Sequence, residues 1–332
     1  MTEKQYGGNT GRETKKIISN QSKENLVLKN KSEKKDYETS NLLEQENYRK
    51  SGKIASEVVK YAKSIIKPRM LLRDIAEKIE AEIEELGGKP AFPVSLSINE
   101  IAAHSTPTSE DETKASGLLK IDLGVHVNGY IADLAFSIDL ENSEENKKLI
   151  EASEKALEEA IKITKKDIEI WKIGEKIHKA ITSSGFSPIR NLSGHELGNY
   201  IVHAGLTIPN YNNNNNTKLP EGAYAIEPFS TTGTGIVYEG KPSGIYRFEK
   251  RAGVRDLLAR EIMNFIEKEY KTLPFCERWI IKKFGNRAKI SLALLEQAGI
   301  IHQYLQLIEK SHQKVSQAET TILITDKVEV LV

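Results

Sequence analysis

Two aspartates, Asp122 and Asp133, lie in the segment "KIDLGVHVNGYIADLAF" at residues 120–136. The dipeptide "NG" at 128–129 separates two runs rich in β-branched and other apolar residues. It therefore predicts a hairpin with a two-residue turn, which fixes the strand register. In that register Gly124 faces Asp133. The two aspartates then share one face as diagonal neighbours, with their backbones about 7 Å apart.

Two carboxylates on one face of a hairpin repel each other, and a favourable interaction must offset that repulsion. At about 6 Å and an effective dielectric constant near 20, two such charges repel by roughly 3 kcal/mol. Either solvent or a cation can compensate, and the hairpin alone leaves both explanations open. The opposite face carries an apolar set that is typical of a buried core: Ile121, Leu123, Val125, Val127, Tyr130, Ala132, Leu134 and Phe136.

Further groups that could bind a metal lie later in the chain. His195 lies in "SGHELG", Glu227 in "AIEPF", and Glu319 begins "ETTILITDKVEVLV". Carboxylates combined with one imidazole suit Mn, Fe, Co or Zn ions that keep open positions for water. Two bridged ions can generate a hydroxide nucleophile and stabilise the charge of a leaving group. The pattern is specific only as an ordered set, because no compact HEXXH-type motif is present.

A helical pattern occurs twice, at an offset of 98 residues. The first copy ends at a Gly-Gly pair, and each copy continues to a proline, a histidine and a strand-like run that ends in a carboxylate. The histidines are His104 in "AAHSTP" and His203 in "IVHAGLTIP". Two structural halves related by a pseudo-twofold, with a site between them, explain this order, and chance similarity of amphipathic helices is the alternative. The repeated residues are Ile75, Ile79, Ile83 and Pro90, then Ile173, Ile177, Ile181 and Pro188.

Composition restricts the class of protein. The 332 residues contain 48 Lys and Arg against 47 Asp and Glu, so the chain lacks the overall basic charge of a dedicated nucleic-acid binder. The composition still allows a local basic patch. The single Cys276 cannot form an internal disulfide. Without a long apolar run or a signal-peptide pattern, we expect a cytoplasmic protein with no membrane partner. Residues 1–47 are polar, and we expect a disordered tail.

Long stretches of the chain, from about Tyr48 to Val332, resemble methionine aminopeptidases of the type II branch, which is archaeal and eukaryotic. The resemblance implies an α+β pita-bread fold, with two pseudo-twofold related halves around a curved antiparallel sheet. The similar segments are "ELGGKPAFPVSLSINEIAAHSTP", "LKIDLGVHVNGYIADLAFS", "NLSGHELGNYIVHAGLTIPN", "AIEPFSTTGTG" and "TLPFCERW".

The resemblance also implies a binuclear centre with two divalent ions per chain, Co, Mn, Fe or Zn. Asp122 would chelate one ion, Asp133 and Glu319 would bridge both, and His195 and Glu227 would complete the other. A bridging hydroxide would then attack the first peptide bond of the substrate.

The same family pattern implies roles for groups around the metals. Glu227 would shuttle the proton, while His104 and His203 would reach the substrate carbonyl and the leaving-group side. The expected function is removal of the initiator methionine from nascent proteins whose second residue is small. The apolar residues expected to line the methionine pocket are Phe92, Pro93 and Val202.

The domain organisation follows the type II pattern. Residues 48–240 and 303–332 would form the catalytic domain, and residues 241–302 would be a small helical insertion that resembles a winged helix. Acidic residues are mixed with basic ones there, as in "EKEYK" at 267–271, so we expect a structural insert and no DNA partner. We expect a monomer whose partners are nascent N-termini and, as a further candidate, the ribosome.

Three positions depart from the family pattern. Thr320 replaces a histidine, Ala318 replaces a larger aromatic residue, and Ser105 replaces a tyrosine. None of these changes removes an expected metal ligand, but such neighbours can change metal affinity or activity by roughly 10- to 100-fold.

Two other functions compete with this interpretation. An Xaa-Pro aminopeptidase or prolidase would share the ligand order but should lack the helical insertion. A non-catalytic RNA- or ribosome-binding relative should have lost one or more of the five ligands, all of which are present here.

Overall fold

The computed structural model describes residues 41–332, and residues 1–40 of the predicted tail lie outside the described part. A helix covers residues 41–65. Residues 41–47, which we had assigned to the disordered tail, are therefore helical, and their Leu, Glu and Gln residues favour that conformation. The description below concerns residues 47–332, which cluster as one unit. Across the described residues, no helix combines the length and the apolar character needed to span a membrane.

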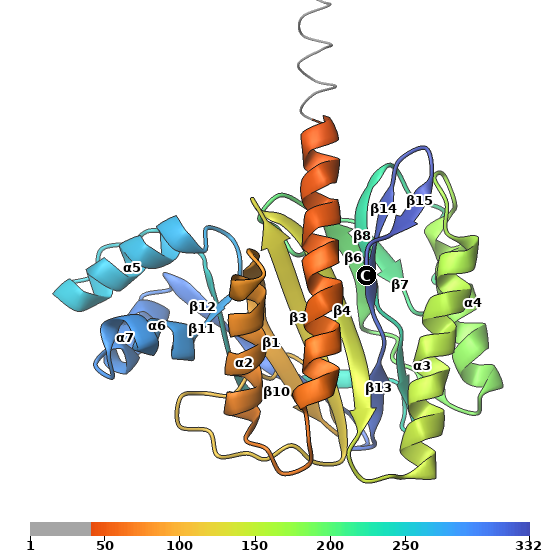
Figure 1. Cartoon of the computed structure of the whole chain (residues 1–332), viewed down its shortest axis with the longest axis horizontal. Helices are drawn as coiled ribbons and strands as arrows, with labels where there is room; N and C mark the ends of the chain where they lie inside the picture. Colours follow the sequence, from red (N-terminus) through yellow and green to blue (C-terminus); the bar gives the residue numbers. More distant parts are fainter. Residues whose placement is uncertain (1–40) are drawn as a thin grey trace, which may run out of the picture. The chain divides into compact units, whose positions relative to one another are not determined.

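The first half packs two helices on a three-stranded antiparallel sheet with the order β1-β3-β4 (Figure 1). Ile75, Ile79 and Ile83 on one helix are fully buried against the core face of the hairpin. Burying such a side chain contributes roughly 1.5–3 kcal/mol. The elements are the helix at 47–65, α2 (Leu72–Glu85), β1 (Lys89–Ile98), β3 (Leu118–Val127) and β4 (Tyr130–Asp139).

The second half repeats this arrangement with a five-stranded sheet in the order β15-β14-β8-β6-β7. Ile173, Ile177 and Ile181 lie fully buried in its core. The helices are α3 (Glu144–Ile163) and α4 (Ile170–Ser183), and the strands are β6 (Ser193–Leu197), β7 (Thr207–Pro209), β8 (Gly222–Ile226), β14 (Thr320–Ile324) and β15 (Val328–Val330).

The helical repeat predicted from the sequence is confirmed. Helices α2 and α4 both contain 14 residues, and their first residues, Leu72 and Ile170, are 98 positions apart. Both helices stop at a glycine with positive φ, Gly87 at 86° and Gly185 at 86°. In each case the following amide bonds back to a buried isoleucine carbonyl, which is the Schellman pattern.

The hairpin register is also confirmed. Gly124 pairs with Asp133, and Asp122 pairs with Ala135. Both turn residues have positive φ, 53° at Asn128 and 88° at Gly129, as a type I′ turn requires. Asp122 and Asp133 consequently share the face that lies opposite the apolar core.

The two halves join where β4 meets the start of β14. Glu319 donates its backbone N–H to the carbonyl oxygen of Ala135 at 2.8 Å. The Thr321 hydroxyl donates to the backbone oxygen of Asp133 at 2.7 Å and accepts from its N–H at 2.7 Å. This junction continues one antiparallel sheet into the other and brings Asp133 beside Glu319.

A further sheet, in the order β11-β10-β12-β2, connects the predicted insertion to the first half. The predicted boundaries at 241 and 302 fall inside its two long strands, so the division into subdomains stays a prediction. The helices between these strands have a core of their own that includes Ile262, Ile266 and Leu292. The elements are β2 (Ile101–Ala103), β10 (Val237–Phe248), α5 (Leu257–Glu269), β11 (Phe275–Cys276), α6 (Glu277–Phe284), α7 (Ala288–Gln297) and β12 (Ile301–Glu309). The last sheet contains β5 (Ser187–Pro188), β9 (Phe229–Thr231) and β13 (Val315–Gln317).

Candidate metal centre

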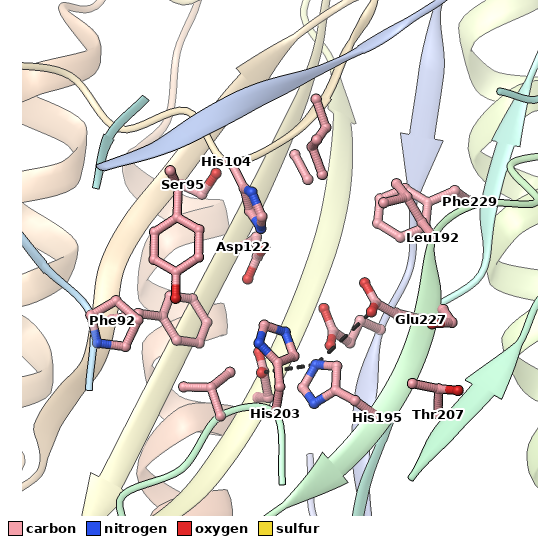
Figure 2. Close-up of a pocket in the computed structure, with 18 of the residues that line it drawn as sticks. Phe92, Ser95, His104, Asp122, Leu192, His195, His203, Thr207, Glu227 and Phe229 are labelled. Carbon is pink, nitrogen blue, oxygen red and sulfur yellow. Dashed lines mark ion pairs between the residues drawn. The ribbon is translucent and has the colours of Figure 1, made fainter. Parts of the chain in front are cut away.

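The five residues predicted to bind metal line one cavity of about 330 Å³. Figure 2 labels three of them, Asp122, His195 and Glu227. Asp122 and Asp133 come from β3 and β4 of the first half, and His195 comes from β6 of the second. Glu227 directly follows β8, and Glu319 directly precedes β14. Both halves therefore supply side chains to the same cavity.

The spacing of the donor atoms suits a metal ion. His195 Nε2 lies 3.7 Å from Asp133 Oδ2 and 3.9 Å from Glu227 Oε1. One donor atom each of Asp133, His195 and Glu319 lies within 4.8 Å of the others. Metal bonds to nitrogen and oxygen are about 2.0–2.2 Å long, so two ligands of one ion are expected to lie roughly 3–4 Å apart.

Four carboxylates in one cavity, with Asp133 and Glu319 buried and Asp122 and Glu227 partly buried, disfavour their own ionisation. Burial raises the pKa of Asp122 to about 7, and a hydrogen bond from Gln317 partly opposes this rise. Burial, followed by repulsion from neighbouring carboxylates, holds the pKa values of Asp133, Glu227 and Glu319 well above the ordinary range. Among the described residues that line the cavity, none is Lys or Arg. A divalent cation would supply the missing positive charge.

The hydrogen bonding of two carboxylates, Asp122 and Glu319, shows how well the residues fit a metal. Asp122 Oδ1 is buried and has no hydrogen-bond partner in the described part of the chain, whereas buried carboxylate oxygens are normally paired. Gln317 Nε2 donates to Glu319 Oε2 at 3.1 Å, which orients that carboxylate. An oxygen without a partner beside an oriented carboxylate fits coordination of a cation.

The histidines at the cavity are held in the neutral form. Burial, and then the nearby His203, lower the pKa of His195 to about 3 and that of His104 to about 4. Desolvation, and then the positive charge of Arg247, also lower the pKa of His203. The rings of His195 and His203 lie edge to face, with centroids 4.3 Å apart. Neutral imidazoles can bind a metal or donate one hydrogen bond.

The predicted pocket residues are only partly brought together. Phe92 and Val202 line the cavity, whereas Pro93 is not among its lining residues. A Cβ atom at Gly124 would lie 2.4 Å from the Phe92 ring, so a glycine at this position makes room for the ring beside Asp133. Sequence reasoning missed several lining residues, which come from strands bordering the insertion or from the segment before α6: Ile245, Pro274, Tyr304 and Leu307.

The three departures from the family pattern lie beside the cavity wall rather than on it. The Thr320 hydroxyl donates to the backbone oxygen of Val332 at 3.0 Å, and Ala318 is buried. The Ser105 hydroxyl accepts from Gln306 at 3.1 Å. None of the three is among the cavity-lining residues.

Comparisons with known proteins agree with the class of site that this geometry defines. The model of metallopeptidase family M24 matches residues 46–257. The methionine aminopeptidase of Pyrococcus abyssi is 46% identical over 279 residues, which are 82% of this chain and 94% of that protein.

Solved structures show the same fold. The structure of a thermophilic Arx1 has a TM-score of 0.71 at 19% identity and covers 86% of this chain and 89% of its own. The methionine aminopeptidase of Thermotoga maritima has a TM-score of 0.62 at 22% identity and covers 86% and 95%. The chain belongs to metallopeptidase family M24, within its methionine aminopeptidases. Membership of this family implies that it uses a divalent metal, and the pita-bread fold is confirmed.

Proposed function

We propose that the chain removes the initiator methionine from nascent proteins whose second residue is small. The observation that carries the proposal is the junction of the two halves, where four carboxylates and His195 meet with no lysine or arginine among the lining residues. Archaeal relatives at 44–46% identity over most of the chain favour this activity over Xaa-Pro hydrolysis.

We propose that the cavity binds two divalent ions, Co, Mn, Fe or Zn. Asp122 would hold one ion, Asp133 and Glu319 would serve both, and His195 and Glu227 would hold the other. Bound ions of this kind activate water and stabilise developing negative charge. The unpartnered Asp122 oxygen and the mutual repulsion of the carboxylates support this assignment.

The protein's own groups then orient the substrate and transfer the proton of the attacking water. The Glu227 carboxylate accepts a proton from the attacking water at an oxygen and returns it to the leaving amine. His104 and His203 are neutral, so each can donate an N–H to the substrate, one at the carbonyl oxygen and the other on the leaving-group side.

The apolar part of the cavity accepts the methionine side chain. Phe92 and Val202 supply apolar surface. Tyr304 also lines the cavity and lies beside His104, with ring centroids 5.5 Å apart. We propose the cytoplasm as the compartment, because nascent N-termini are the substrate. The monomeric state and a contact with the ribosome stay predictions.

A peptide assay distinguishes this function from its nearest rival. Protein loaded with Mn or Co should release methionine from a Met-Ala peptide and should leave a Met-Lys peptide intact. An Xaa-Pro peptide serves as the second substrate. Turnover of the Xaa-Pro peptide without turnover of Met-Ala would identify a prolidase-type enzyme and contradict the proposal.

A further inference from the structure

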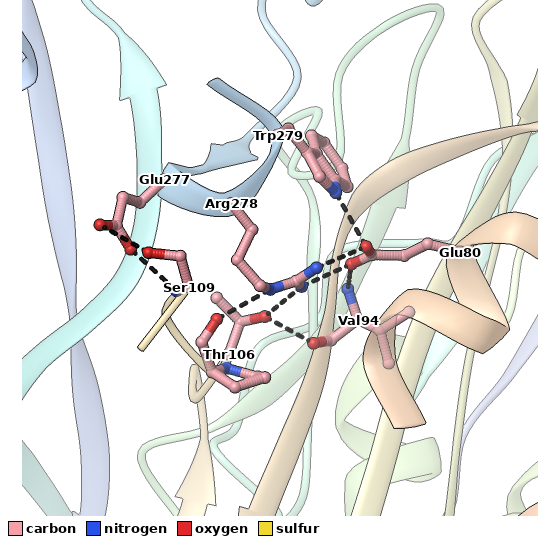
Figure 3. A network of polar contacts seen from close by, with 8 residues as sticks. Glu80, Val94, Thr106, Ser109, Glu277, Arg278 and Trp279 are labelled. Atoms are coloured by element: carbon pink, nitrogen blue, oxygen red, sulfur yellow. Dashed lines mark hydrogen bonds and ion pairs between the residues drawn. The ribbon is translucent and has the colours of Figure 1, made fainter. Parts of the chain in front are cut away.

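A buried ion pair connects two helices that are far apart in the sequence. Arg278 in α6 and Glu80 in α2 form a two-pronged contact, Nη1 to Oε2 at 2.7 Å and Nη2 to Oε1 at 2.8 Å (Figure 3). Their side chains are only 3% and 8% exposed. The Trp279 indole donates to the same carboxylate at 2.9 Å. A pair this deeply buried holds its partners in one geometry.

The same guanidinium also binds the turn that follows His104. Arg278 Nε donates to the backbone oxygen of Pro107 at 2.8 Å, and Nη2 donates to the Thr106 hydroxyl at 3.2 Å. That hydroxyl in turn donates to the backbone oxygen of Val94 at 2.8 Å. Arg278 thus links the turn to α2 through Glu80, and the Thr106 hydroxyl links it to Val94 of β1.

His104 needs this support because its backbone is strained. Its φ is 57°, in the left-handed region that residues other than glycine rarely adopt. The next residues are fixed on both sides. The Ser105 N–H donates to Ser95 Oγ at 3.0 Å, and the Thr106 N–H donates to the Ser243 carbonyl at 3.1 Å. The hydrogen bonds that fix residues 105–107 therefore also help to fix the orientation of the His104 ring.

Glu80 extends this support to the cavity wall. Its Oε1 accepts the backbone N–H of Val94 at 3.2 Å. Val94 lies where the pairing of β1 with β3 shifts, between Phe92 and Ser95. Both of these flanking residues line the cavity. One buried carboxylate thus supports the cavity wall and anchors the arginine that holds the His104 turn.

We propose that Arg278 is a positioning residue for catalysis, which acts through the 105–107 turn to hold His104 at the cavity. The inference rests on the proposed aminopeptidase function. A lysine keeps the charge but cannot make the forked contact to Glu80 and bind Pro107 and Thr106 as well. A displacement of about 1 Å in a catalytic group can cost about 100-fold in rate. We therefore expect Arg278→Lys to lower kcat/KM by about 10- to 100-fold, mainly through kcat.

A double-mutant cycle separates positioning from general stability. Arg278→Lys, His104→Ala and the double variant are compared on a Met-Ala peptide. If Arg278 acts through His104, the lysine substitution costs less than about 2-fold once His104 is alanine. An equal loss in both backgrounds overturns the inference. Trp279→Phe is the matched control, because it removes a hydrogen bond to Glu80 but none to the turn, and it should keep kcat/KM within about 2-fold.

A variant in the turn itself covers the case in which Arg278→Lys does not fold. Thr106→Val keeps the ion pair and removes the hydroxyl between Arg278 and Val94, so it should show the same dependence on His104. Amide hydrogen exchange of residues 104–109 should quicken in Thr106→Val and stay unchanged in Trp279→Phe. Unchanged exchange and unchanged activity in Thr106→Val would overturn the inference about Arg278. Turnover of the Met-Ala peptide by the wild-type protein would still uphold the proposed function. A wild-type protein without that turnover overturns both.

Discussion

Two segments with a histidine reach the cavity, residues 104–107 from the first half and residues 198–205 from the second. They are held in place by different contacts. In the first segment Thr106 and Pro107 are buried and bind Arg278, a residue more than 170 positions away. In the second segment Ile201, His203 and Gly205 are exposed, whereas Val202 and Ala204 are half-buried. That segment relies on backbone bonds between Gly198 and Ile201, at 2.8 and 3.0 Å.

This difference shows that a structural repeat need not repeat its means of stabilisation. The second segment depends on the hairpin turn, since the Tyr200 N–H donates to the Gly129 carbonyl at 2.8 Å, and on a hydrogen bond from Thr272 to the Tyr200 carbonyl. The first segment depends on a buried charge pair instead. Each half thus supplies one histidine to the cavity. Of the two, His104 depends on the distant Arg278–Glu80 ion pair and His203 does not.

The largest expected effect comes from removing the Glu227 carboxylate, which lines the same cavity as both histidines. Glu227→Gln should lower kcat for a Met-Ala peptide by about 10²- to 10⁴-fold, because the amide cannot accept the proton. Steady-state kinetics measures the loss, and circular dichroism checks the fold. A loss below tenfold would contradict the role of Glu227.

The next effect concerns the acidic cavity between the two segments, in protein stripped of metal. The pKa of Asp122 is raised from 3.8 to about 7, so the folded state binds more protons than the unfolded state does between these values. Stability is therefore fully present below about pH 4 for this group and is lost as pH rises through 7, by at most about 4 kcal/mol.

Thermal unfolding at pH 6 and pH 8 measures this dependence. The metal-free protein should have the lower Tm at pH 8, and added Mn or Co should raise Tm most at pH 8. Asp122→Asn should weaken the pH dependence. An equal Tm at both pH values without metal would contradict the assigned electrostatics.

Stability variants measure the difference between the two segments. Glu80→Gln leaves Arg278 buried without its counter-charge and should lower the free energy of unfolding by about 3–5 kcal/mol. Thr272→Val removes one exposed hydrogen bond from the other segment and should cost about 1 kcal/mol or less. Urea denaturation compares the two, and similar losses would show that the segments are held alike.

The smallest expected effect is in local opening. The amide N–H groups of Ser105 and Thr106 are bonded within a mostly buried turn, so they should exchange more slowly with solvent than those of residues 198–205. Hydrogen exchange followed by mass spectrometry measures this contrast without any substitution. Faster exchange at 104–107 than at 198–205 would reverse it.

The sequence predicted those parts of the fold that depend on local patterns. The "NG" turn gave the register that pairs Gly124 with Asp133, and the isoleucine stripe gave α2 and α4. The ordered set of carboxylates, together with the family resemblance, placed five candidate ligands at one cavity.

Long-range contacts could not be predicted in the same way. No pattern relates Arg278 to Glu80, because charged residues are common on helix surfaces and only tertiary packing buries this pair. Tyr304 reaches the cavity because β12 pairs with both β10 and β2, and neither pairing has a turn motif that fixes it. At the shift in β1 between Phe92 and Ser95, the Val94 N–H likewise donates to a carboxylate from another element, Glu80 in α2.

The metal centre itself can be observed by anomalous diffraction from crystals grown with Mn or Co. We predict two peaks in the cavity, with Asp133 and Glu319 contacting both ions, Asp122 contacting one, and His195 and Glu227 contacting the other. Saturated protein should contain two ions per chain by metal analysis. Peaks outside the cavity, or none at saturating metal, would contradict the assignment of these five residues.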